Sequence, residues 1–160
     1  LLELDYGDAP DPSFPTLLAS NGARHSLAGG LFLGSTVDGD VDGQPSPGAD
    51  GDDTDGTDDE DGVVLPASMV AGFEETVEVT ASTAGLLNAW IDFNADGDWL
   101  DAGEQVAVDL ALAPGTTSVP VAVPLDATAG PTFARWIRVG PAPDPRPRPG
   151  PGAPPPAPGK

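Results

Sequence analysis

The sequence predicts an all-β protein, in which an antiparallel β-sandwich follows a long acidic N-terminal loop region and precedes a disordered, proline-rich tail. Between residues 62 and 140, short segments alternate apolar and polar residues, as half-buried strands do. Turn residues such as Ala113-Pro114-Gly115 separate these segments. No segment has the periodicity of a long amphipathic helix, so we expect packed sheets without a helical layer.

Six strands are expected, and each depends on a local residue pattern. In the second, Val77 and Val79 alternate with polar residues, and in the fifth Val119, Val121 and Val123 share one face. The expected strands cover residues 63–65, 73–80, 86–93, 104–112, 117–123 and 132–139.

Two of these strands carry more detailed expectations. In the fourth strand, strict alternation would place Val106, Val108, Leu110 and Leu112 on one face. In the fifth strand, Pro120 has no backbone N–H to donate to a neighbouring strand, which favours an edge position.

Composition divides the chain into three parts. Residues 1–61 are an irregular segment that contains the acidic loop and is expected to pack on the following domain, the sandwich of residues 62–140. Residues 141–160 contain half of the 20 prolines, and a segment of this composition cannot form a strand ladder. We therefore expect a disordered tail there.

The charge balance excludes several classes of partner. The chain has 26 acidic and six basic residues, a formal net charge of −20, so its surface repels nucleic acid and anionic lipid. No apolar run approaches the ~20 residues of a membrane-spanning helix, and we expect no membrane insertion. The absence of cysteine excludes disulfides and thiolate catalysis. The chain begins without methionine, and we expect it to be a piece of a longer protein.

Residues 38–61 hold eleven acidic residues and no cation. Two carboxylates about 4 Å apart repel by roughly 4 kcal/mol at an effective dielectric constant near 20. Such groups either spread into water or gather around a cation, and Asp interleaved with Gly lets a loop wrap its oxygens around a hard ion. Residues 38–61 are thus either a solvated acidic segment or a calcium site, which would be the second in the chain besides the one expected at residues 92–104. The candidate ligands are Asp38, Asp40, Asp42, Asp52, Asp53 and Asp58.

Residues 92–104 form the most specific motif in the chain. Oxygen-bearing side chains occupy its first, third and fifth positions, and Gly97 follows at the sixth, as in the first half of an EF-hand calcium loop. Residue 98 would offer its backbone carbonyl, and Glu104 stands at position 13, one residue later than the bidentate glutamate of an EF-hand. The predicted metal ligands are Asp92, Asn94, Asp96, Asp98 and Glu104.

The flanks of this loop distinguish it from a calcium sensor. An EF-hand lies between helices, whereas expected strands lie on both sides of residues 92–104, so we expect a calcium loop mounted on a β-hairpin. The alternative is a polar hairpin loop in which Asp and Asn only stabilise turns. Magnesium is less suited than calcium, because it usually retains its water ligands.

Further motifs are spread over residues 4–139. They lie at residues 5–11, 23–25, 33–34, 38–42, 51–53, 58–62 and 90–99. Together they resemble the GEVED-type domain, which recurs in large secreted and cell-surface proteins of bacteria, often beside adhesin-like repeats. The resemblance implies a β-sandwich with a calcium-associated acidic loop, an extracellular location and a spacer or adhesive role without catalysis.

The C-terminal part departs from that family pattern. The pattern continues after the last strand into the string Gly-Glu-Val-Glu-Asp-Tyr, whereas Gly140 is followed here by the proline-rich stretch. Without a closing strand, one sheet edge would remain unpaired.

These observations predict a non-catalytic, calcium-binding structural or adhesive module of a larger bacterial surface or secreted protein. Its expected partners are calcium, neighbouring modules of the same chain, and a host, matrix or polysaccharide ligand. One alternative is a calcium-dependent carbohydrate-binding module, in which a tryptophan stacks on sugar. Another is a fragment of a glycosidase with paired carboxylates.

We expect structural roles for the three tryptophans and for the single histidine. Trp90 and Trp136 lie in expected strands and should belong to the core, whereas Trp99 should cover the calcium loop. His25 is the only histidine, and the sequence pairs it with no nucleophile or acid, so a structural hydrogen bond is expected, with metal ligation as the alternative.

Overall fold

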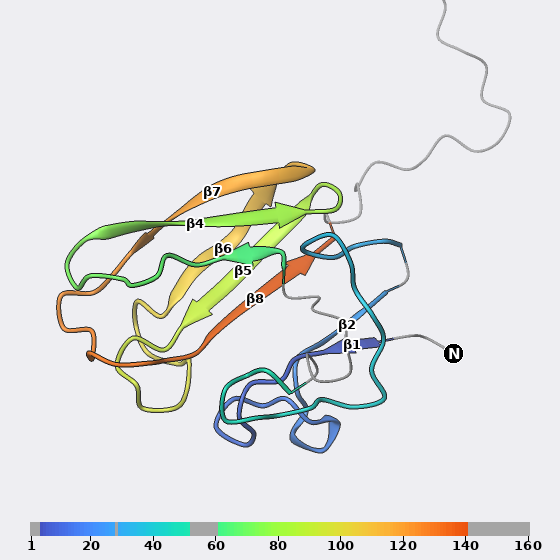
Figure 1. Cartoon of the computed structure of the whole chain (residues 1–160), viewed down its shortest axis with the longest axis horizontal. Coiled ribbons are helices and arrows are strands. Elements are labelled where there is room, and N and C mark those ends of the chain that lie inside the picture. The colour runs from blue at the N-terminus through green and yellow to red at the C-terminus, as the bar shows by residue number, and fades with distance from the viewer. Residues whose placement is uncertain (1–3, 28, 52–60, 141–160) are drawn as a thin grey trace, which may run out of the picture.

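The computed structural model describes residues 4–27, 29–51 and 61–140, which form two facing antiparallel sheets with an N-terminal segment beside them (Figure 1). One sheet has the order β3-β4-β7, with strands Val63–Val64, Glu74–Ala81 and Gly115–Ala122. The other has the order β6-β5-β8, with strands Gln105–Leu112, Gly85–Ile91 and Ala134–Val139. The all-β, antiparallel prediction is confirmed. The expected tail, residues 141–160, lies outside the described residues.

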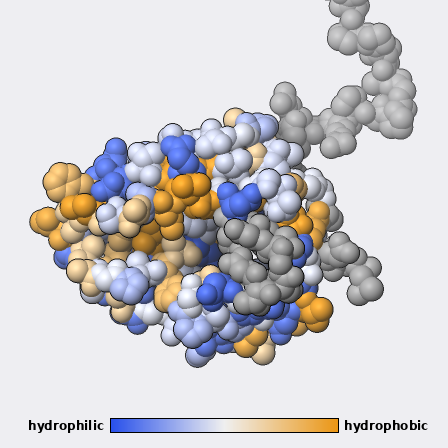
Figure 2. Space-filling model, in the orientation of Figure 1, coloured by the Kyte–Doolittle hydropathy of each residue, from blue (hydrophilic) through white to orange (hydrophobic). Residues whose placement is uncertain are grey.

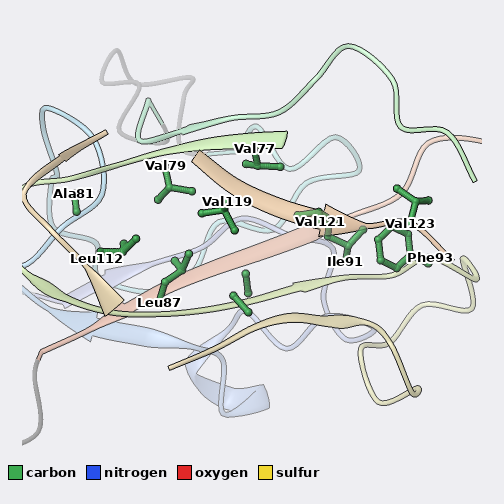
Figure 3. Close-up of a cluster of buried hydrophobic side chains, with 12 residues drawn as sticks. Val77, Val79, Ala81, Leu87, Ile91, Phe93, Leu112, Val119, Val121 and Val123 are labelled. Atoms are coloured by element: carbon green, nitrogen blue, oxygen red, sulfur yellow. The ribbon is translucent and has the colours of Figure 1, made fainter. Parts of the chain in front are cut away.

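The two sheets bury a common apolar core (Figure 3). Val77 and Val79 of β4 and Leu87 of β5 are completely buried, and Val119 and Val121 of β7 are 1 % exposed. Valine dominates because a β-branched side chain packs well on a pleated surface. Full burial of such a side chain stabilises the fold by about 1.5–3 kcal/mol.

Strand β7 lies at a sheet edge, as its proline indicated. In the described chain it pairs only with β4, where Pro120 lies opposite Thr76. The expected inward face of this strand is also confirmed, because Val119, Val121 and the following Val123 are all buried.

Strand β6 does not follow the expected alternation. Val108 is 66 % exposed, whereas Ala107 is buried in the core, so the prediction of one shared face is wrong. The register gives the reason: Leu87 pairs with Leu110 and Ala89 with Ala107, which leaves one extra residue in β6. Asp109 has a positive φ of 45° at this bulge. A single inserted residue reverses which side chains face the core.

The N-terminal segment contains two short strands that its sequence did not reveal. Strand β1 (Leu4–Tyr6) pairs with β2 (Arg24–Ser26), and η1 (Leu18–Ser20) is one 3₁₀ turn between them. Strands of three residues are too short to show a periodic pattern, which explains why the segment was expected to be irregular.

This segment contacts both sheets of the sandwich. Leu33 forms a β-bridge with Ala81 at the end of β4, and Arg135 of β8 donates to the carbonyl of Pro15 at 2.9 Å. The division of the chain at residue 61 into two units stays a prediction.

His25 connects the β1–β2 pair to the segment that follows it. Its Nδ1 lies 3.0 Å from Oδ2 of Asp5, and its Nε2 contacts the carbonyl oxygen of Leu31. The hydrogen bond to Asp5, helped by that carbonyl, raises the pKa of His25 although burial opposes the shift. The expected structural role of this histidine is therefore confirmed.

Apolar side chains are exposed at the end of the sandwich where β4 begins (Figure 2). Val70, Phe73 and Leu125 are 50 %, 65 % and 84 % exposed. Gly72 allows close packing there, since a Cβ atom at this position would lie 2.9 Å from Cδ1 of Leu125. The β5–β6 connection leaves the sheets at the same end (Figure 1).

Truncation of a buried leucine should lower the free energy of unfolding far more than truncation of an exposed one. Leu87→Ala removes a completely buried side chain and should lower the free energy of unfolding by about 2–5 kcal/mol. The same change at the exposed Leu125 should alter it by no more than about 0.5 kcal/mol. Denaturant titration of both variants measures the difference, and equal losses would contradict the assigned core.

The His25 contacts should make stability depend on pH. Because the folded pKa is raised above 6.5, the stabilisation is fully present below pH 6.5 and is lost as the pH rises through the folded value. Relative to His25→Gln, the wild type should therefore lose free energy of unfolding over that interval. Denaturant titrations across the interval test this, and a constant difference between the two proteins would contradict it.

Candidate metal centre

The candidate metal centre lies in the connection between β5 and β6. The backbone N–H of Ile91 donates to the carbonyl of Glu104 at 2.9 Å, which brings the two ends of residues 92–104 together. The N–H of Asp92 donates to the carbonyl of Phe133 at 3.1 Å, which ties the start of the loop to the approach of β8. The loop is therefore mounted on a β-hairpin, as its flanking sequence indicated.

Side chains of the loop fold its backbone inward. The N–H of Gly97 donates to Oδ2 of Asp92 at 3.1 Å, and the N–H of Asp96 donates to Oδ1 of Asn94 at 3.0 Å. The N–H of Asp98 donates to Oδ1 of Asp96 at 3.2 Å. Gly97 has a φ of 92°, which a residue with a Cβ rarely adopts. The expected sharp turn at position six of the loop is present.

This folding gathers carboxylates from both ends of the loop. One oxygen each from Asp92, Asp96 and Glu104 lies within 4.8 Å of the other two. Glu104 thus reaches the same point as Asp92 although it stands one residue later than in an EF-hand. A second trio of oxygens, from Asp96, Asp98 and Asp101, meets the same distance.

Asp101 is a site residue that the sequence interpretation missed. Besides joining Asp96 and Asp98, it accepts a hydrogen bond from Nδ2 of Asn94 at 2.8 Å. The same Nδ2 donates to Oδ2 of Asp96 at 3.0 Å, so this amide nitrogen lies between two carboxylates and offsets their repulsion. The position of Asp101, three residues before Glu104 in an oxygen-rich loop, was the available signal.

Two of the gathered carboxylates are buried without sufficient partners. Asp92 is 2 % exposed and Glu104 is 3 % exposed. In the described part of the chain, Oδ1 of Asp92 and Oε1 of Glu104 have no hydrogen-bond partner. Burial, and then the charges of Asp92 and Asp101, raise the pKa of Glu104 against the opposing hydrogen bond from the Asp101 N–H. A buried anion without a partner is unfavourable, and a cation bound between these oxygens would remove the penalty.

The segment of residues 128–132 donates hydrogen bonds to the backbone of the loop. Oγ1 of Thr128 donates to the carbonyl of Asn94 at 2.8 Å, and Oγ1 of Thr132 donates to the carbonyl of Asp92. A cavity of about 280 Å³ is lined in part by Asn94, Asp101 and Glu104. The residues present therefore fit a hard cation with oxygen ligands, both in their chemistry and in their unpartnered buried atoms.

Trp99 contacts groups outside the loop. Its ring centroid lies 4.4 Å from that of Phe14, and the guanidinium carbon of Arg135 lies 4.4 Å from the indole ring. Its Nε1 donates to the carbonyl of Phe133 at 3.4 Å. Trp99 thus fastens the loop to β8 and to the N-terminal segment.

The acidic run of residues 38–61 does not form a comparable cluster in its described part. Oδ2 of Asp40 accepts from the N–H of Tyr6 at 3.1 Å, and Oδ1 of Asp42 accepts from the N–H of Leu18 at 2.6 Å. Within residues 4–27, 29–51 and 61–140, Asp38, Asp40 and Asp42 belong to no group of three close acidic oxygens. The other three predicted ligands, Asp52, Asp53 and Asp58, lie outside the described residues, so a second site stays a prediction.

Comparison with known proteins identifies the domain. Residues 86–150 match the family model of the GEVED domain, a range that includes most of β5, the whole metal-centre loop and strands β6 to β8. Over these residues the chain matches the GEVED domain family, as the motif at residues 90–99 indicated, whereas the other motifs of the expected resemblance lie before the matched range. No curated protein and no solved structure matches the chain.

Removal of the Glu104 charge should stabilise the metal-free protein. Glu104→Gln abolishes repulsion from Asp92 and Asp101 and keeps an oxygen to accept the N–H of Asp101. In excess chelator the variant should therefore melt at a higher temperature than the wild type. Glu74→Gln, at an exposed position of β4, is the matched control and should leave the melting temperature unchanged. A lower melting temperature for Glu104→Gln would contradict the assigned repulsion.

Proposed function

We propose that this chain is a non-catalytic, calcium-binding module of a larger extracellular protein, with a structural or adhesive role. The observation that carries the proposal is the convergence of Asp92, Asp96 and Glu104, two of them buried with unpartnered oxygens. The GEVED match supports an extracellular module of a larger protein.

The donor set favours calcium over other metals. The sequence has no cysteine, and its single histidine is engaged by Asp5 and by the carbonyl of Leu31. The available ligands are carboxylate, amide and carbonyl oxygens, which suit hard cations. Calcium accepts six to eight such oxygens in irregular geometry, whereas magnesium requires a smaller, near-octahedral set and retains waters.

Calcium would act on this module through stability. Extracellular modules bind calcium with dissociation constants of about 10⁻⁴ to 10⁻³ M. At ten times the dissociation constant, one site stabilises the folded state by about 1.4 kcal/mol. The stabilised part would include the segment that leads into β8, because Phe133 and Thr132 bond the loop directly.

A structural role requires neighbours. The proposed partners are calcium, adjoining modules of the same chain and a host, matrix or polysaccharide ligand, at the surface of a bacterial cell or in a secreted protein. Among the described residues, no helix is long and apolar enough to span a membrane. The net charge of −20 disfavours nucleic acid as a partner, and we expect no direct membrane insertion.

The tryptophan positions argue against the carbohydrate-binding alternative. Such a module needs an exposed aromatic face. Trp90, Trp99 and Trp136 are each only partly exposed, Trp99 contacts Phe14 and Arg135, and Trp136 packs against the core. Retention on a polysaccharide column would favour this alternative.

Burial argues against the glycosidase alternative. Asp92 and Glu104 are close enough to act as paired carboxylates, and the pKa of Glu104 is raised as in a general acid. Both side chains are almost completely buried, however, so a glycosidic bond has no access between them. Hydrolysis of a glycan by the intact chain would overturn this conclusion.

The test of calcium binding is a thermal melt with calcium and with chelator. For the full chain, calcium at ten times its dissociation constant should raise the melting temperature by about 3 to 6 °C. Asp96→Ala should remove most of this increase, because Asp96 belongs to both trios of oxygens.

The control removes an acidic group elsewhere. Glu74→Ala lowers the negative charge equally at an exposed site on β4 and should retain the full calcium-dependent increase. Equal melting temperatures of the wild type in calcium and chelator would refute calcium binding. A loss of the increase in both variants would assign it to general charge screening.

A further inference from the structure

A cleft of about 440 Å³ lies between the N-terminal segment and the edge of the sandwich at β8. Its walls include β1, β2, the stretch before β4 and the whole of residues 132–138. Its volume falls within the range of about 300–1,000 Å³ that is usual for small-molecule sites. Tyr6, Phe32, Leu33 and Trp136 supply apolar walls.

The cleft gathers the cationic groups of an otherwise acidic molecule. Within the described residues, every arginine, namely Arg24, Arg135 and Arg138, lines it, and so does His25. The remaining three basic residues of the chain belong to residues 141–160. The electrostatic potential in the cleft is therefore more positive than the net charge of −20 alone would indicate.

Two carboxylates also line the cleft, and both already have partners. Asp5 pairs with His25 at 3.0 Å, and Oδ2 of Asp8 accepts from the N–H of Gly51 at 3.0 Å. Arg135 is likewise engaged, since it contacts Trp99 and donates to the carbonyl of Pro15 at 2.9 Å.

Arg138 is different, because it is buried and incompletely bonded. It is 4 % exposed, and its Nη2 donates to the carbonyl and hydroxyl of Thr83 and to the carbonyl of Ala84. Its Nε and Nη1 are buried, and no group in the described part of the chain accepts from them. Nε1 of Trp136, two residues earlier on β8, is also buried without an acceptor.

These unpartnered groups are all hydrogen-bond donors, so the ligand that satisfies them must supply acceptors. A buried guanidinium without an anion is unfavourable, and a carboxylate is the complementary partner because it accepts several hydrogen bonds at once. We propose that this cleft binds a monocarboxylate with an apolar body, held by Arg138 and Trp136. The apolar body would lie against Tyr6, Phe32 and Leu33.

The net charge of the chain restricts the ligand further. A polyanion such as a nucleic acid or an acidic peptide would meet repulsion from the rest of the surface, whereas one carboxylate carries the smallest such penalty. The proposed binding uses no residue of the 92–104 loop and goes beyond the proposed calcium function.

Titration of the full chain with phenylacetate tests the proposal. In excess chelator, phenylacetate should produce a saturable shift of the Trp136 indole N–H resonance in ¹H–¹⁵N spectra. Phenylacetamide, which has the same body without the charge, should bind about tenfold more weakly or worse. Octanoate and octanamide repeat the comparison with an aliphatic body.

Matched tryptophan variants provide the control. Arg138 also supports residues 83 and 84, so its removal could unfold the chain, and Trp136→Phe is the sharper variant. Binding to these variants is followed through the Arg138 Nε–H resonance. Trp136→Phe should weaken phenylacetate binding several-fold. Trp90 does not line the cleft, so Trp90→Phe should leave the binding unchanged. No saturable shift, equal affinity for amide and carboxylate, binding that requires calcium, or equal effects of the two variants would each overturn the proposal.

Discussion

Repulsion between carboxylates confined to one hairpin is the constraint on which this structure depends. Asp92 and Glu104 approach each other because backbone pairing at the base of the loop brings residues 91 and 104 together. The amide of Asn94 and the loop N–H groups offset part of the repulsion, but two buried oxygens keep no partner in the described chain. The hairpin between β5 and β6 therefore holds buried negative charge, which opposes folding unless a cation binds between the carboxylates.

Local spacing was sufficient to predict much of the fold and part of the site. The alternation of Val119, Val121 and Val123 identified a strand face, and Pro120 identified its edge position. The positions of Asp92, Asp96 and Gly97 predicted an inward-folded loop, because these residues interact within a few positions of one another.

Features that depend on distant contacts were not predictable from the sequence. The β6 bulge reverses which of Ala107 and Val108 faces the core, and it is defined by pairing with β5. Arg138 finds its acceptors at residues 83 and 84, more than fifty positions away. No local pattern marks such an arginine as buried, and the cleft that it lines was therefore missed.

The attachment of the loop to the approach of β8 has a mechanical consequence. Ala134 pairs with Ile91 beside the loop, and Val139 pairs with Leu86 at the opposite end of the sheet. A pulling force transmitted through residues beyond 140 would thus load β8 lengthwise, in shear against β5. The backbone pairs between β5 and β8 would resist this load together with the bonds that join Thr132 and Phe133 to Asp92. Ion occupancy of the hairpin would then set how firmly a tethered chain bears tension.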